Sequence, residues 1–361
     1  MDQNDFEQKY TFDRGTYYSS PRWNDFTLDD ERRAKKRFSR FFLAAAIYIV
    51  LSNVAAIIIT LLLALIFGEG VTTVTESSWY GLTLNTVAMY VIALPVFILL
   101  TGGMRKTVRF KDRIKISEYF KIFLVAYAFM TVGSAIGNYL NLLIGAFIGK
   151  TPSNSTSDLI LSSEMWIVIL VAVIIGPIVE EFMFRKLLMD KLGMYGDRLA
   201  IIVSAISFGI FHGNFYQFFH AAMIGFILAY LYSKTANIWY PIGIHILLNF
   251  VGSVFPMLLM DKITRFEELS NIIASGAEIS DALMTEFTQI STIVGAYSLI
   301  SIAMTISGLV IFFKKRHNIF ISDRCEIFLP KERRANVIFA NVGVITYLVI
   351  CGALMILNIF A

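Results

Sequence analysis

The chain has 361 residues, of which 57% are hydrophobic and only 16% carry a charged side chain. A typical soluble domain is about 45–50% apolar and about 25% charged. This composition therefore excludes a soluble enzyme, a coiled coil, a disordered protein and a collagen-like fibre. The formal net charge of +4 is too small a surplus to indicate a nucleic-acid partner. The partner that the composition predicts is the lipid bilayer.

Long apolar runs repeat along the chain with short gaps between them. A helix needs roughly 20 apolar residues to cross a hydrocarbon core about 30 Å thick. The runs therefore predict an all-α fold, a polytopic membrane helix bundle of eight or nine transmembrane helices, of which the fifth is short. The predicted spans are 41–68, 81–102, 121–149, 165–194, 199–213, 216–233, 238–259, 290–313 and 336–361.

The spans and the segments between them predict five regions. Residues 1–37 are polar and mixed in charge, which predicts a disordered cytoplasmic tail and excludes a cleavable signal peptide. Residues 38–160 are expected to form the N-terminal transmembrane helices, and 161–259 the core of the bundle. Residues 260–289 are acidic and predict an extracytoplasmic connector, although their apolar spacing also fits a short amphipathic helix. Residues 290–361 are expected to form the C-terminal transmembrane helices.

The basic residues are distributed unevenly between the two sides of the predicted bundle. Cytoplasmic loops of membrane proteins carry an excess of Lys and Arg. With nine spans, 28 of the 31 Lys and Arg residues fall on one side, and only Lys150, Lys262 and Arg265 fall on the other. This split predicts that the N-terminus lies in the cytoplasm and the C-terminus outside.

The third predicted span contains a pair of glycines four residues apart. Gly133 and Gly137 form a GxxxG pattern, which lets membrane helices approach one another closely. One match in a glycine-bearing helix is a weak signal, but it indicates a close-packing face.

The most informative stretch is IIGPIVEEFMFRKLL, residues 174–188. Each charged side chain in the middle of a membrane helix costs roughly 2.5–3.5 kcal/mol, so Glu180, Glu181 and Arg185 must face the bundle interior and pair. Glu181 and Arg185 are four residues apart with the acid first, which favours a helical ion pair. Glu180 points about 100° away and has no partner in its own helix. A shielded carboxylate without an ion pair suits a general base.

Two features of this stretch leave its interpretation open. Pro177 lies one turn before the acidic pair and removes a backbone hydrogen bond, which could open room for water. The structural alternative is that the pair ends the helix at the cytoplasmic surface, with Arg185 and Lys186 in the headgroup region. On this stretch alone, the two interpretations are equally good.

The histidines favour the interpretation in which the glutamate pair faces the bundle interior. The chain has four histidines. His212 and His245 lie in separate apolar runs, and Asn249 follows His245 by one helical turn on the same face. His317 lies in a basic loop and is expected to be solvated, and His220 is interpreted as structural. Two intramembrane imidazoles with an amide and a glutamate pair indicate a functional cluster.

The depth of each side chain in the membrane determines whether this cluster can form. At 1.5 Å per residue, Glu180 and His212 both lie about 20 Å from the predicted turn between the fourth and fifth spans, and His245 lies about 12 Å from its own turn. The three side chains can share a layer only if the fourth span continues past Arg185.

A carboxylate, two imidazoles and an amide in a shielded cavity suit hydrolysis. Glu180 would take a proton from water, His212 would help to hold the water, and His245 and Asn249 would donate hydrogen bonds to the developing oxyanion. The competing use is a zinc site with Glu180, His212 and His245 as ligands. The HExxH pattern of common zinc proteases is absent from the sequence, which favours a site that needs no cofactor.

These residues resemble a known family. EEFMFR at 180–185 matches an EExxxR motif, FGIFH at 208–212 matches FxxxH, and HILLN at 245–249 matches HxxxN. Their order and spacing are similar to those of the CPBP intramembrane proteases, which include the type II CaaX prenyl endopeptidases and bacteriocin-processing or bacteriocin-immunity proteins. The resemblance covers 174–250, about a fifth of the chain.

The resemblance implies a catalytic role for six residues. It makes Glu180 the water-activating glutamate, Glu181 and Arg185 its supporting pair, and His212, His245 and Asn249 the remaining catalytic residues. The family has been described both as metalloproteases and as metal-free glutamate proteases. The resemblance also implies an integral, multi-pass protein of a bacterial-type cell membrane.

We therefore expect an intramembrane endopeptidase that acts near the cytoplasmic leaflet on a lipidated protein or a peptide. The candidate substrates are a prenylated CaaX-type tail and a bacteriocin-type peptide. Two alternatives are a non-catalytic scaffold or immunity protein of the same fold, and a proton-coupled transporter that uses Glu180 as its carrier. The intact motifs favour the enzyme, and the oligomeric state stays open.

Overall fold

The computed structural model describes residues 26–107, 109, 112–276, 280–318, 321 and 325–360, and within these ranges the chain is helical with no strand. Eight helices in the described part are long and apolar enough to cross a membrane, which confirms the polytopic helix bundle. The predicted span outside these eight is the fifth, 199–213, which forms α11 with 15 residues, about 22 Å at 1.5 Å per residue. This helix is too short to cross a full hydrocarbon core unless the bilayer thins locally.

The helices follow the predicted spans in chain order. The N-terminal part consists of α2 (Leu28–Phe67), η1 (Gly68–Gly70), α3 (Val71–Thr75), α4 (Tyr80–Thr86), η2 (Val87–Ala93), α5 (Leu94–Thr101), α6 (Ile116–Ile148) and α7 (Ser155–Ser162). The middle part consists of α8 (Met165–Val168), η3 (Ile169–Ile175), α9 (Gly176–Glu181), η4 (Phe182–Met189), α10 (Asp190–Leu192), η5 (Gly193–Tyr195), α11 (Asp197–Phe211) and α12 (Phe215–Thr235). The C-terminal part consists of α13 (Trp239–Asn249), η6 (Phe250–Val254), α14 (Phe255–Ala274), α15 (Asp281–Lys315), η7 (Arg316–Asn318), α16 (Lys331–Phe339) and α17 (Val342–Phe360).

The first helix begins earlier than predicted. The predicted disordered tail extends to residue 37, but α2 begins at Leu28. Thr27 and Asp30 form a reciprocal capping box, in which the Asp30 amide donates to the Thr27 hydroxyl at 3.2 Å and the Thr27 amide donates to the Asp30 carboxylate at 3.0 Å. This box satisfies amides at the helix start and so stabilises it. The predicted disorder is wrong for residues 28–37, because they are helical. Residues 1–25 lie outside the described part, so disorder there stays a prediction.

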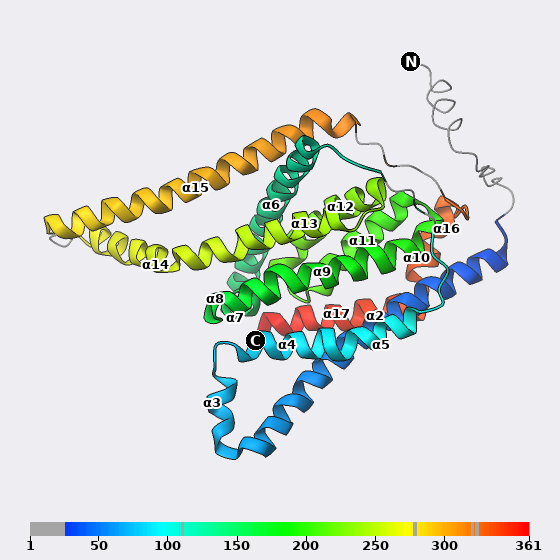
Figure 1. Ribbon diagram of the computed structural model, residues 1–361, viewed down its shortest axis with the longest axis horizontal. Helices are drawn as coiled ribbons and strands as arrows, with labels where there is room; N and C mark the ends of the chain where they lie inside the picture. Colours follow the sequence, from blue (N-terminus) through cyan, green and yellow to red (C-terminus); the bar gives the residue numbers. More distant parts are fainter. Residues whose placement is uncertain are drawn as a thin grey trace.

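The segment predicted as an acidic connector, residues 260–289, is largely helical. α14 runs through to Ala274 and α15 begins at Asp281, so the amphipathic-helix alternative describes 260–274 better. Arg265 of α14 donates to both carboxylate oxygens of Glu286 on α15, at 2.8 and 3.0 Å. The rings of Phe266 and Phe287 stack at 5.7 Å between the same two helices. These contacts explain why the segment pairs as a hairpin, which Figure 1 shows projecting from the bundle at the left.

The last predicted span, 336–361, is divided. α16 ends at Phe339 and α17 begins at Val342. Asn341 stabilises the break because its side chain accepts from the Val344 amide at 3.0 Å and donates to the Val337 carbonyl at 2.9 Å. An asparagine that bonds to nearby backbone competes with a continuous helix, so the apolar run does not form one straight span.

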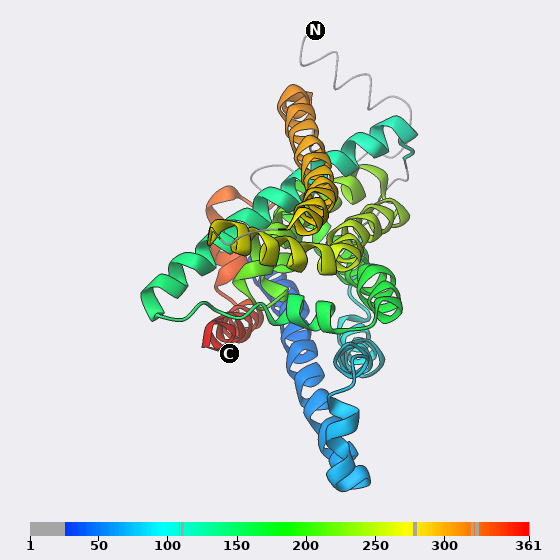
Figure 2. The same cartoon turned by 90° about the vertical axis from the view of Figure 1, so that its left-hand side faces the viewer.

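The bundle core brings the middle helices together around α12. α12 packs on both α6 and α11, and α17 lies beside α2. Figures 1 and 2 show α15 and the α2–α3 end on opposite sides of this centre. The main hydrophobic core contains Phe38, Phe97, Leu188 and Phe208. It therefore joins α2, α5, η4 and α11.

The GxxxG pair of α6 forms the close-packing face that the sequence indicates. A Cβ on Gly133 would overlap the backbone of His220 in α12, and one on Gly137 would press against the backbone of Phe215 and Tyr216. The absence of these Cβ atoms lets the two helices touch along their main chains.

We expect Gly133→Ala to lower the stability of the folded protein by about 1–3 kcal/mol, because overpacking forces the two helices apart. The measurement is thermal unfolding of the purified protein in detergent. Gly295→Ala in α15 is the matched control, because a Cβ there meets nothing within 4 Å. Equal melting temperatures for the two variants would contradict the packing role of Gly133.

Candidate active site

The fourth predicted span continues far beyond Arg185. The helix that begins at Met165 ends at Tyr195, and the Arg185 side chain is 0% exposed. The condition for the polar side chains to share a layer is therefore met. The alternative in which the acidic pair ends the helix is wrong, because the helix continues for ten residues beyond Arg185 and protein encloses the arginine.

Glu181 and Arg185 form a fully buried ion pair. The Arg185 Nε and the Glu181 Oε2 are 2.9 Å apart, and both side chains are 0% exposed. Arg185 Nη1 also donates to the Ser204 hydroxyl at 2.8 Å, and that hydroxyl donates to the Phe184 carbonyl at 3.1 Å. The guanidinium lies 5.1 Å from the centre of the Phe208 ring. The arginine is thus held by a carboxylate, a hydroxyl and an aromatic face.

The same ion pair orients His245. Its Nδ1 is 3.1 Å from the Glu181 Oε1, and a carboxylate paired with an arginine can only accept a hydrogen bond. The Nδ1 therefore carries a proton and donates a hydrogen bond to Glu181. The Nε2 of the same ring faces the Glu180 Oε2 at 3.7 Å. Glu180 and His245 therefore meet in the layer that the sequence predicts.

His212 is linked to His245 by the ring of Phe208, which packs against both imidazoles. It follows α11, and its Nδ1 is 2.8 Å from the Phe208 carbonyl, so this Nδ1 also donates and the Nε2 is left as an acceptor. The Phe208 ring packs edge-on against both imidazoles, with centroids 4.9 Å from His212 and 5.7 Å from His245. Between His212 and Glu180, both in the described part, no ion pair forms.

Asn249 fills a gap that Pro177 makes in the backbone. The Gly176 amide donates to the Val171 carbonyl, five residues back, so the next amide in this register would donate to Ala172. Residue 177 is a proline and has no N–H. The Asn249 Nδ2 donates to the Ala172 carbonyl instead, at 2.9 Å. A neighbouring side chain thus satisfies a carbonyl freed inside the membrane, and α13 is tied to η3.

The site is surrounded by wide helical turns. In the described residues four segments have the π-helical form, η2, η3, η4 and η6. η3 and η4 flank the α9 segment that carries Glu180 and Glu181, and η6 follows Asn249 directly. π-helical turns are rare and occur frequently at functional sites.

Glu180, His212 and His245 are the predicted ligands of the zinc alternative. Zinc needs its ligand atoms about 2.0–2.2 Å from one ion, so the three side chains must converge closely. In the part of the chain that the structure describes, no three His, Cys, Asp or Glu side chains are already grouped in this way. The choice between a zinc site and a metal-free site stays a prediction.

Sequence reasoning missed two neighbours of the site. Ser204 binds Arg185, but no motif marks a serine one helical turn before Phe208. His220, interpreted as structural, lies within electrostatic range of His212 and His245 and also packs against Gly133. Its structural interpretation stays a prediction.

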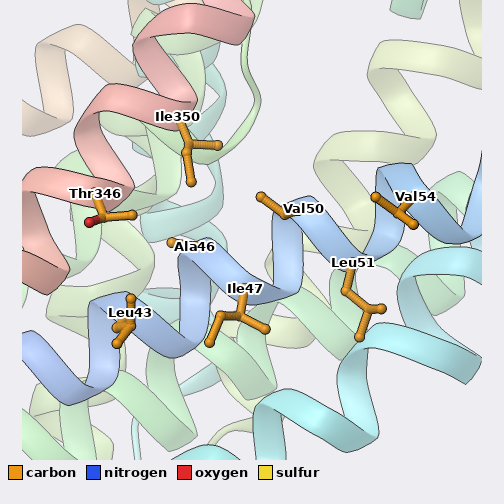
Figure 3. Close-up of a pocket in the computed structure, with 8 residues that line it drawn as sticks. All are labelled: Leu43, Ala46, Ile47, Val50, Leu51, Val54, Thr346 and Ile350. Atoms are coloured by element: carbon orange, nitrogen blue, oxygen red, sulfur yellow. The ribbon is translucent and has the colours of Figure 1, made fainter.

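An apolar groove lies elsewhere on the bundle, between α2 and α17. Figure 3 shows its lining, which contains none of the predicted site residues; it consists of Leu43, Ala46, Ile47, Val50, Leu51, Val54, Thr346 and Ile350. Most of these side chains are aliphatic, so the groove offers no group that can move a proton.

Comparisons with known proteins agree with the architecture of the site. A sequence model described as type II CAAX prenyl endopeptidase Rce1-like matches residues 162–251. The putative membrane peptidase YdiL of Bacillus subtilis (strain 168) is 30% identical over 211 residues, which cover 56% of this chain and 83% of that protein. The membrane-embedded CAAX protease MroQ of Staphylococcus aureus (strain USA300) is 26% identical over 200 residues, which cover 52% and 79% of the two chains. No solved structure matches this chain.

A membrane helix bundle whose glutamate pair meets His245, together with similarity to membrane peptidases, indicates an intramembrane protease. The segment matched by the family model, 162–251, contains every residue of the predicted site. The chain belongs to the Rce1-like type II CAAX prenyl endopeptidase family. It is a CAAX-type membrane protease, as the resemblance implies, and the roles of its individual residues stay predictions.

We expect Arg185→Met to destabilise the protein by about 3–5 kcal/mol, because it leaves Glu181 buried without its cation. The measurement is denaturant or thermal unfolding in detergent. Arg265→Met is the control, because its ion pair with Glu286 is 37–40% exposed and an exposed pair contributes about 1 kcal/mol or less. Equal losses would show that burial does not decide the contribution of Arg185.

Proposed function

We propose that Glu180 is the general base of a metal-free peptide hydrolysis at the cytoplasmic side of the membrane. The observation that carries this proposal is the position of Glu180, whose carboxylate faces the Nε2 of His245 at 3.7 Å while Glu181 is occupied by Arg185. Of two adjacent carboxylates, one neutralises a buried cation and the other stays available for proton transfer.

In the proposed reaction, Glu180 takes a proton from a water molecule, and the water oxygen attacks the carbonyl carbon of the scissile peptide. The electron pair of the C=O bond moves to the oxygen, which becomes an oxyanion. When the C–N bond breaks, Glu180 returns the proton to the leaving amine. The Nε2 lone pair of His212 accepts the second hydrogen of the water and orients it, because the His212 Nδ1 already donates to the Phe208 carbonyl.

The polar network beyond the site supports the cytoplasmic placement. The Lys186 Nζ and Asp190 Oδ2 are 2.9 Å apart, and the Lys186 side chain is 42% exposed. Asp190 also accepts from the Tyr232 hydroxyl at 2.8 Å. Lys186 lies six residues after Glu180, about 9 Å along the helix. This charged end belongs to the side that carries 28 of the 31 Lys and Arg residues, so Glu180 would lie in the cytoplasmic half.

A prenylated CaaX-type tail is the substrate that we favour. The family description names CAAX prenyl endopeptidases, and one relative is named a CAAX protease. A lipidated tail is anchored at the cytoplasmic surface, so its peptide would reach the layer of Glu180 from that side. A leader peptide of bacteriocin type is the alternative substrate.

We expect Glu180→Gln to abolish cleavage of a membrane-anchored prenylated peptide with no loss of melting temperature, because the amide has nearly the same size but cannot take a proton. Product formation is followed by mass spectrometry in proteoliposomes. A bacteriocin-type leader peptide in the same assay distinguishes the two substrate classes. Wild-type activity in Glu180→Gln would refute the role of this glutamate.

Chelation tests the metal-free part of the proposal. The wild-type protein is expected to keep its activity after treatment with a strong chelator, because the proposed steps use only side chains and water. Activity that disappears with the chelator and returns with zinc would overturn the metal-free part of the proposal. The Glu180→Gln variant would then remain the test of whether Glu180 takes part in the reaction.

The predicted orientation places the N-terminus inside and the C-terminus outside. A reporter enzyme that is active only outside the cytoplasm is expected to be active after fusion to residue 360, and inactive after fusion to the loop at 102–103. This result follows from the uneven distribution of basic residues. The reverse pattern of activity would contradict the placement of the site in the cytoplasmic leaflet.

A further inference from the structure

The proposed hydrolysis needs hydrogen-bond donors for the oxyanion, and most donors at the site already have acceptors. The Nδ1–H of His245 donates to Glu181, and that of His212 donates to the Phe208 carbonyl. One N–H of Asn249 donates to the Ala172 carbonyl. Arg185 is bound to Glu181 and Ser204. Asn249 is left with one N–H.

Tyr48 of α2 carries a buried donor next to this site. Its side chain is 1% exposed, and its hydroxyl has no hydrogen-bond partner among the residues that the structure describes. A buried polar group without a partner calls for an explanation. The ring packs against Phe97 and Phe211 at 5.9 and 5.8 Å between centroids, and Phe211 contacts His212. Tyr48 also lies within electrostatic range of Glu180.

Tyr90 approaches Glu180 from a second helix. It lies in η2, one of the four π-helical segments. Its hydroxyl lies 3.5 Å from the position that a Cβ on Gly176 would occupy. Gly176 precedes Glu180 by one helical turn on the same face, and its lack of a side chain leaves space at that point. Tyr90 is within electrostatic range of both Glu180 and Tyr48.

The packing of the bundle brings together the segments that carry these two tyrosines. α2, which carries Tyr48, packs directly on η2, which carries Tyr90, and α4 packs on η3. Figure 1 shows α2, α4 and α5 on the side of α9 opposite α12 and α13.

We propose that the hydroxyls of Tyr48 and Tyr90 donate hydrogen bonds that stabilise the oxyanion. This inference rests on the proposed function of Glu180. The phenols keep their protons during the reaction, and they stabilise charge that develops on the carbonyl oxygen as the water oxygen bonds to carbon. The scissile peptide would then lie between α9, which is inside the segment 162–251 that the family model matches, and the α2–η2 pair, which is outside it.

The test uses Tyr48→Phe, Tyr90→Phe and the double variant in full-length protein in proteoliposomes, with the prenylated peptide as substrate. Removing one oxyanion donor lowers kcat by about 10²–10³-fold, so each single variant is expected to lose kcat in this range with little change in KM. The melting temperature of Tyr48→Phe is expected to stay the same or rise, because its hydroxyl makes no hydrogen bond within the described residues.

Tyr347→Phe is the matched control. Tyr347 is a buried tyrosine whose hydroxyl donates to the Ser207 carbonyl at 2.8 Å, so its loss is expected to lower the melting temperature while kcat is kept. A purely structural role of Tyr48 and Tyr90 would produce this same pattern.

Glu180→Gln, assayed in parallel, separates the two hypotheses. If Glu180→Gln is inactive and the two tyrosine variants keep the wild-type kcat, the donor role of the tyrosines is overturned and the proposed function stands. If Glu180→Gln is active, the proposed function itself fails. A Tyr48→Phe protein that melts at a lower temperature, combined with wild-type kcat in Tyr90→Phe, would likewise overturn the donor role.

Discussion

The buried ion pair between Glu181 and Arg185 is the interaction on which the site depends. Moving two charges into a low-dielectric interior is expensive, and the pair repays this only if every remaining hydrogen-bonding position is satisfied. Here the guanidinium binds Ser204 and the second carboxylate oxygen binds His245. The cation therefore neutralises one glutamate and, through that glutamate, fixes the tautomer of an imidazole. The adjacent Glu180 makes no ion pair with a lysine or arginine of the described residues, so its carboxylate stays available for proton transfer.

The irregular backbone around the site also helps to position His245 relative to Glu180. A proline inside a membrane helix frees a carbonyl that lipid cannot satisfy. In the π-helical register of η3, the carbonyl that Pro177 frees is that of Ala172. The side-chain amide of Asn249 in α13 donates a hydrogen bond to it at 2.9 Å. Pro177 and Asn249 thus form one structural unit, although they are 72 residues apart in the sequence. The unit holds α13, and with it His245, at a fixed height relative to Glu180.

Much of this arrangement follows from local sequence rules. The helical spacing of Glu181 and Arg185 predicts their ion pair, and counting 1.5 Å per residue predicts the shared layer of Glu180 and His245. The contact of Asn249 with Ala172 could not be predicted, because it depends on a π-helical register that no residue pattern marks. The start of α2 at Leu28 was missed although Thr27 and Asp30 show the capping spacing, because the mixed charges of the segment suggested disorder. Hydrophobicity alone therefore locates the helices, and irregular hydrogen bonding decides how they end and meet.

The tyrosines show a further limit of motif-based reasoning. Tyr48 and Tyr90 lie in apolar runs where an aromatic residue is an ordinary packing residue, and only the folded chain shows that their hydroxyls lie near a carboxylate. The segment that the family model matches, 162–251, supplies the acid, the imidazoles and the amide. On the proposed mechanism, α9 provides the carboxylate that accepts the proton, and α2 and η2 provide the hydroxyls that donate to the oxyanion. The site is then complete only when α2 and η2 pack against α9. The N-terminal helices would then do more than anchor the protein, because the space between them and α9 would hold the reacting peptide and thereby decide which peptide can enter.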